Sequence, residues 1–214
     1  MKYLLALFLF CAFDSSAQDE LNTDKDPYAG VKGHPFLLDE WMKGTIKFNS
    51  GRVLDQFKLK FDIARNVLLL QFQGSAFAAE AKVVSFTIYT KGKKSADSLV
   101  FRRGFPAFEN NNAEVFYHVL CDGPTKLLKY PKKVISEEKK LVSATNRSFE
   151  QQDSFYLLKD GAMIKILPDK TSLLASLSDK SDELKKFVAE KDLKLRGEED
   201  YLLVVNRYNE LKKE

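Results

Sequence analysis

The chain has 214 residues, of which 30% are charged and 44% hydrophobic, and its formal net charge is +4. Because both signs of charge are mixed along the chain, this composition predicts a solvated surface and excludes the basic footprint of a nucleic-acid-binding protein. With only two cysteines, the chain is not a disulfide-stapled scaffold, and its stability must come from a packed core.

The start of the chain has the layout of a secretory signal peptide. Lys2 gives a short basic start, residues 3–13 are apolar, and small residues follow at Ser15 and Ala17. These small side chains predict a cleavage between Ala17 and Gln18. The apolar run is also too short for a transmembrane helix, which needs about 20 residues. We therefore expect an exported protein without a transmembrane segment in the mature chain.

The next stretch, residues 18–32, is polar and acidic and contains Pro27. We expect a flexible lead-in there. Ordered structure is expected from residue 33, because the first apolar cluster begins at Phe36 and ends at Trp41.

The middle of the chain carries apolar runs broken by turn residues, which is typical of an antiparallel sheet. In residues 57–61 and 84–89, every second side chain is apolar, so each segment predicts a strand with one buried face. Residues 67–72 form a continuous apolar run, which predicts a strand covered on both faces. Residues 62–66 are few enough to close a hairpin, and residues 98–103 predict a further strand.

Two similar stretches, residues 116–130 and 155–167, each place an Asp-Gly pair between apolar runs. Asp-Gly is a strong hairpin signal because a type I′ turn needs positive φ at both central residues. We predict type I′ hairpins at Asp122-Gly123 and at Asp160-Gly161. The similarity is therefore interpreted as a repeated structural solution and not as a duplicated functional site.

The segment between these hairpins is highly charged and weakly patterned. Hydrophobic alternation, the main signal for a strand, is weak there. We expect a short strand at Val134 and Ile135 and a long mobile loop over the rest.

The last 45 residues change to helical spacing. In the final segment, Tyr201, Val204, Val205 and Tyr208 recur every three to four residues. Two to three short helices are predicted, and because short helices are marginal alone, they must pack on the sheet or on each other.

Strands followed by helices predict an α+β fold. The predicted organisation is a signal peptide over residues 1–17, a lead-in over 18–32, an antiparallel β domain over 33–167, and a C-terminal helical segment over 168–214 that packs on it.

The sequence offers few groups for catalysis or metal binding. Once the signal peptide is removed, Cys121 has no cysteine partner in the chain, and we interpret it as a small buried residue. A pair with His118 would need a bulge, because residues three apart on a strand point to opposite faces. His34 and His118 are the only histidines, and no metal-ligand motif is present. We predict no catalytic residue, no metal and no cofactor.

The segment 101–112 is the best binding candidate in the sequence. Arg102 and Arg103, followed by Phe105 and Phe108, could present cations and aromatic rings to a carboxylate or a glycan. The alternative is a strand end and a surface loop whose phenylalanines cap the core.

In their residues and in their order along the chain, three stretches resemble a family of secreted proteins common in Bacteroidota: residues 33–54, 116–129 and 181–211. The family carries no assigned reaction, so the resemblance implies only a location, the periplasm or envelope of a Gram-negative bacterium.

From these observations we expect a non-enzymatic binding or interaction module of the cell envelope. Its partner would be an envelope component or a small ligand, and not nucleic acid. Two alternatives stay open: a hydrolase with dispersed carboxylates, and a carrier whose aromatic sheet encloses a lipid or another small hydrophobe.

Overall fold

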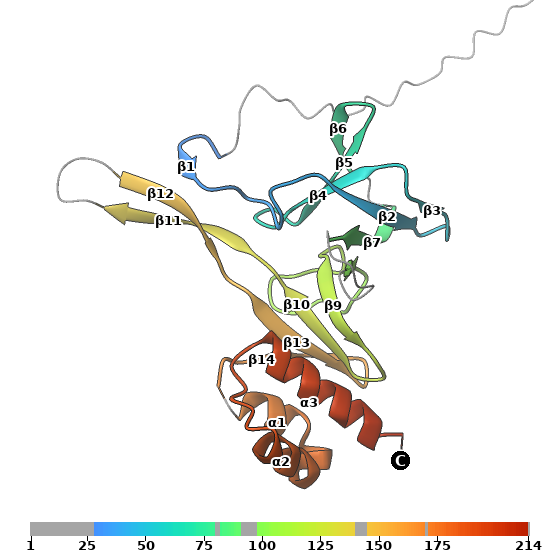
Figure 1. Cartoon of the computed structure of the whole chain (residues 1–214), viewed down its shortest axis with the longest axis vertical. Coiled ribbons are helices and arrows are strands. Elements are labelled where there is room, and N and C mark those ends of the chain that lie inside the picture. The colour runs from blue at the N-terminus through green and yellow to red at the C-terminus, as the bar shows by residue number, and fades with distance from the viewer. Residues whose placement is uncertain (1–27, 80–81, 91–97, 140–144, 170, 214) are drawn as a thin grey trace, which may run out of the picture.

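A computed structural model describes residues 28–79, 82–90, 98–139, 145–169 and 171–213 (Figure 1). The predicted signal peptide, its cleavage site between Ala17 and Gln18, and most of the predicted lead-in lie outside these residues. Within them, no helix is long and apolar enough to cross a membrane.

The fold is α+β, as predicted: a meander of antiparallel hairpins is followed by short helices (Figure 1). The main sheet has the order β14-β13-β10-β9-β8-β7-β2-β4-β5-β6, and β3 also pairs with β2. In chain order its strands are β2 Met42–Phe48, β3 Val53–Leu54, β4 Lys58–Asp62, β5 Val67–Phe72, β6 Ser75–Ala78, β7 Val83–Tyr89, β8 Ser98–Arg102, β9 Tyr117–Asp122, β10 Lys126–Tyr130, β13 Ser154–Lys159 and β14 Ala162–Ile166.

The N-terminal half of the sheet folds back on itself. Strand β2 pairs with β4 through Met42 and Lys43 and with β7 from Gly44 onward. Gly44 is required at this bend, because a Cβ there would overlap the Thr87 carbonyl oxygen.

The fold-back builds an aromatic core. The Phe61 ring of β4 lies 5.1 Å from Phe86 and 4.9 Å from Phe101, and Phe116 packs beside them. These rings fill the space between the folded halves, which favours a packed core over an enclosed ligand cavity in this part of the sheet.

The prediction that residues 67–72 are covered on both faces is wrong. Leu68 and Leu70 are buried on one face of β5, whereas Val67, Leu69 and Gln71 on the other face are only half-buried. Strand β5 lies next to the last strand of the sheet, so one of its faces remains partly open.

The strand predicted at Val134 and Ile135 is present and is longer than expected, but the long loop predicted over the rest of this segment is wrong for the described residues. Strands β11 (Lys133–Lys139) and β12 (Thr145–Gln151) pair in register, and β1 (Val31–Lys32) adds to β12 in parallel (Figure 1). Hydrophobic alternation is weak in these strands. Charged cross-strand pairs, such as Arg147 Nε with Glu137 Oε1 at 3.2 Å, stabilise their pairing instead.

The two Asp-Gly turns differ. Asp160 and Gly161 have φ of 51° and 78°, which fits the predicted type I′ turn. The hairpin predicted at Asp122-Gly123 is present as β9 and β10, but the predicted type I′ turn is wrong, because neither residue has positive φ and residues 123–125 form the connection.

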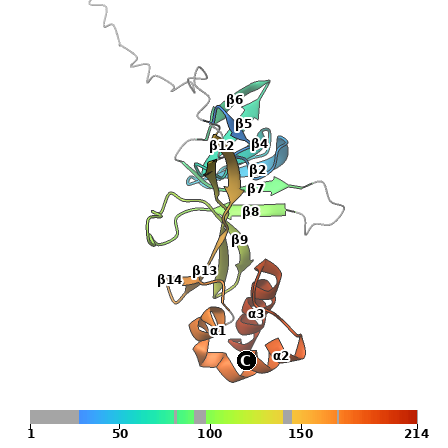
Figure 2. The same cartoon turned by 90° about the vertical axis from the view of Figure 1, so that its left-hand side faces the viewer.

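The helices α1 (Ser172–Ser176), α2 (Ser181–Glu190) and α3 (Glu198–Leu211) pack on the sheet at the end opposite to the β5–β6 hairpin (Figures 1 and 2). Val204, Val205 and Tyr208 of α3 are buried in a cluster with Leu127 and Leu157 of the sheet. A separate cluster around Tyr117 and Tyr156 contains Phe105, from the segment between β8 and β9.

Candidate functional site

His118 on β9 is half-buried beneath an aromatic ring. Its imidazole stacks on Phe101 with ring centroids 5.1 Å apart. Burial lowers the pKa of His118 from 6.5 to about 4, because the charged form loses its hydration. The ring is therefore neutral near pH 7.

Strand β9 contains a bulge that the sequence did not reveal. The register with β10 shifts between Leu127 and Leu128, so that Cys121 lies opposite Leu127 and His118 opposite Lys129. Leu127 and Lys129 are two residues apart, so His118 and Cys121 lie on one face of the sheet, and the prediction that they lie on opposite faces is wrong.

The bulge nevertheless does not make a Cys–His pair. The Cys121 thiol donates to Asn206 Oδ1 at 3.1 Å and accepts from Asn209 Nδ2 at 3.4 Å. The thiol is buried, as predicted, and both of its partners come from α3.

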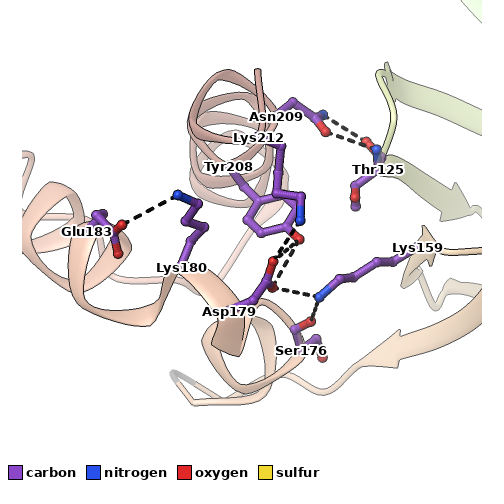
Figure 3. A network of polar contacts seen from close by, with 9 residues as sticks. All are labelled: Thr125, Lys159, Ser176, Asp179, Lys180, Glu183, Tyr208, Asn209 and Lys212. Carbon is purple, nitrogen blue, oxygen red and sulfur yellow. Dashed lines mark hydrogen bonds and ion pairs between the residues drawn. The ribbon is translucent and has the colours of Figure 1, made fainter. Parts of the chain in front are cut away.

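An open hollow of about 430 Å³ lies where the β9–β10 connection meets α3. Its lining combines Cys121 with polar side chains, chiefly Asn206, Asn209, Glu210 and Lys213. Asn209, which lines the hollow, has a structural role. It accepts a hydrogen bond from Thr125 N–H at 2.9 Å and donates one to the Thr125 carbonyl oxygen at 2.8 Å (Figure 3). These bonds fix the β9–β10 connection to the helix.

A second network joins the helices to β13. Asp179 accepts from Lys159 at 2.8 Å, from the Tyr208 hydroxyl at 2.9 Å and from Lys212 at 3.2 Å (Figure 3). The pKa of the Asp179 carboxyl is held well below its ordinary value, chiefly by the Lys159 ammonium. The network stabilises the docked helices.

The buried carboxylate of Asp62 has a structural role. It accepts from the Tyr28 hydroxyl at 2.9 Å, from Arg65 Nε at 2.9 Å and from the backbone of Ala64 and Arg65. These donors close the β4–β5 turn and hold the segment around Tyr28 against it. Within the described ranges, no group of three or more His, Cys, Asp or Glu could hold a metal ion.

The side chains of the predicted binding segment, residues 101–112, make contacts within the protein. Arg102 Nη2 lies 2.6 Å from Asp122 Oδ2, and Arg103 Nη1 lies 3.0 Å from a Glu114 oxygen. Phe105 is buried, and the Phe108 ring packs on Tyr156. This arrangement favours the alternative interpretation, in which the phenylalanines cap the core.

The β5–β6 edge is a feature that the sequence reasoning missed. Phe72 and Phe77 are 39% and 43% exposed, and their ring centroids lie 5.6 Å and 6.0 Å from that of Phe57. All of β6 is exposed, and it is the last strand in the order of the main sheet. We call β6 and these three phenylalanines the aromatic edge.

A sequence signal for the aromatic edge exists. Residues 66–79 form an uncharged run of 14 residues in a chain that is 30% charged. Gln73 and Gly74, with φ of 50° and 88°, close the hairpin within that run. In a chain with so many charges, an uncharged exposed hairpin is typical of an interaction surface.

Comparison of the chain with protein-family models, with curated proteins and with solved structures finds no match.

Proposed function

We propose that the chain is an exported, non-enzymatic binding module of the bacterial cell envelope, and that it binds its partner through the aromatic edge. The observation that carries the proposal is the exposed, uncharged strand β6, whose Phe77 clusters with Phe57 and Phe72. Export and envelope location are supported by the signal-peptide layout and by the resemblance to secreted proteins of Bacteroidota.

The chemistry of the edge favours a polypeptide partner in an extended conformation. An edge strand offers backbone N–H and C=O groups, and a partner that adds as a further strand satisfies them. The ring of Phe77, which stands beside that row of groups, can pack on alternate side chains of the added strand.

The experiment replaces Phe77 with the photo-crosslinker benzoylphenylalanine in the producing cell. A matched control places the crosslinker at Leu203, which is similarly exposed at 47% but lies on α3. We expect a discrete covalent adduct from position 77 and none of that mass from position 203. The same adducts from both positions, or none from position 77, would contradict the proposed binding surface.

The non-enzymatic part of the proposal has its own test. Purified protein is expected to leave generic ester, peptide and glycan substrates unchanged. Turnover that disappears in the Cys121→Ala variant or in a single carboxylate variant would assign the protein to the hydrolases instead.

A further inference from the structure

The outer side of β6 is an open backbone edge. The Ala79 N–H donates to the Leu68 carbonyl oxygen at 2.8 Å, so Ala79 faces β5. Hydrogen-bonding direction alternates along an antiparallel strand, and the backbone groups of Ala76 and Ala78 therefore point away from β5. Within the described part of the chain no strand lies on that side.

We propose that this edge pairs with the same edge of a second copy of the chain, an inference that rests on the proposed use of the aromatic edge as the binding surface. A two-fold axis perpendicular to the sheet at Phe77 places Ala76 of each copy opposite Ala78 of the other. In this register both outward-facing residues of each β6 exchange backbone hydrogen bonds. Phe77 of one copy lies directly opposite Phe77 of the other, on the same face, and such aromatic pairs stabilise antiparallel strands.

The charge distribution permits this self-pairing. Each chain carries a net charge of +4, so most self-contacts of its lysine-rich surface bring like charges together. Residues 75–79 contain no charged side chain, and in the proposed register only Ser75, Ala and Phe77 side chains face one another across the two-fold axis.

The other long sheet edges of the described chain differ from β6. Strand β14 carries Lys165, which is ion-paired with Glu109 at 3.0 Å, and strand β11 carries the exposed Glu137 and Glu138. Charged side chains on an edge strand oppose edge-to-edge pairing. Strand β6 lacks this protection, which points to an edge that is covered by another strand.

The size of the contact sets the strength of the association. Stable interfaces bury about 800 Å² on each partner. A four-residue strand with half-exposed phenylalanines offers less than that, so we infer a reversible dimer whose population rises with protein concentration.

Analytical ultracentrifugation of the purified mature chain tests the proposal. We expect a concentration-dependent monomer–dimer equilibrium that Phe77→Lys weakens at least about tenfold, while the matched control Leu203→Lys leaves it unchanged. The variant Ala76→Pro removes only an outward-facing N–H and keeps the bonds to β5, so it gives a second readout if Phe77→Lys does not fold.

The register has a separate readout. In a Cys121→Ser background, Phe77→Cys is expected to form a disulfide-linked dimer on mild oxidation, because opposite residues of a non-hydrogen-bonded pair bring their Cβ atoms close together. Leu203→Cys is the matched control and is expected to stay monomeric.

Two outcomes would overturn self-pairing: a wild-type chain that stays monomeric up to its solubility limit, or a dimer that neither Phe77→Lys nor Ala76→Pro weakens. A monomeric chain that still gives a photo-adduct of a different mass at position 77 assigns the aromatic edge to another polypeptide. That result overturns the second copy as the partner and leaves the proposed function standing. A monomeric chain without any adduct at position 77 contradicts both.

Discussion

The imidazole of His118 illustrates how position changes the chemistry of a single side chain. Its burial lowers its pKa to about 4, compared with 6.5 for a free imidazole, and its ring stacks on Phe101. A histidine that is neutral, half-buried and stacked on a buried ring is typical of a structural residue. The same group on an exposed strand would titrate near physiological pH.

This burial predicts a pH dependence of stability. The pKa of His118 is lower in the folded chain, so the unfolded chain binds more protons between pH 6.5 and about 4. Stability should therefore fall as the pH falls through this window, with a slope of up to about 1.4 kcal/mol per pH unit from this group. Urea unfolding of the wild-type chain and of His118→Phe at several pH values measures the difference. An equal slope in both proteins would show that His118 does not titrate as inferred.

At the scale of elements, the β9–β10 connection and α3 form one unit. Gly123 has no Cβ, and a Cβ there would lie 2.8 Å from Asn209 Cγ. The glycine at this turn is required for close approach and not for positive φ, which explains why the Asp-Gly rule for type I′ turns fails at Asp122-Gly123.

A double-mutant cycle follows from this contact. Gly123→Ala should lower the free energy of unfolding by about 1–3 kcal/mol, because the new methyl group displaces Asn209 from Thr125. In an Asn209→Ala background the clash is gone, so the same substitution should cost much less. Urea unfolding of the four proteins gives the coupling energy. Additive effects of the two substitutions would contradict the proposed contact.

At the scale of the whole molecule, the helices and the aromatic edge lie at opposite ends (Figure 1). The helices cover the sheet face that carries Cys121, Leu127 and Leu157, and these side chains are almost fully buried. The covered end and the open end of one sheet therefore differ in their exposed apolar surface.

Removal of the chain from Thr171 onward tests the role of the helices. The truncated chain should expose the Leu127 and Leu157 side chains, bind a hydrophobic dye and aggregate. Cys121, which is 9% exposed in the full chain, should react much faster with a thiol reagent. A truncated chain that stays monomeric with a protected thiol would show that the helices do not cover this face.

Local patterns predicted those features that depend on neighbours in sequence. Alternation in residues 57–61 predicted β4, the spacing of Tyr201, Val204 and Tyr208 predicted α3, and Asp160-Gly161 predicted its turn. Each signal is sufficient because a strand, a helix and a tight turn repeat over two to four residues. The sequence by itself therefore determined an antiparallel sheet followed by helices.

Only the tertiary structure decided what depends on partners distant in sequence. The bulge that turns Cys121 toward α3, the charged pairing of β11 with β12, and the position of β6 at an edge all depend on which strands meet. The same holds for the segment 101–112, whose arginines are engaged in ion pairs with Asp122 and Glu114. An edge strand and a central strand can have the same local sequence. Long-range pairing alone determines whether the backbone groups of β6 are covered or remain open to a partner.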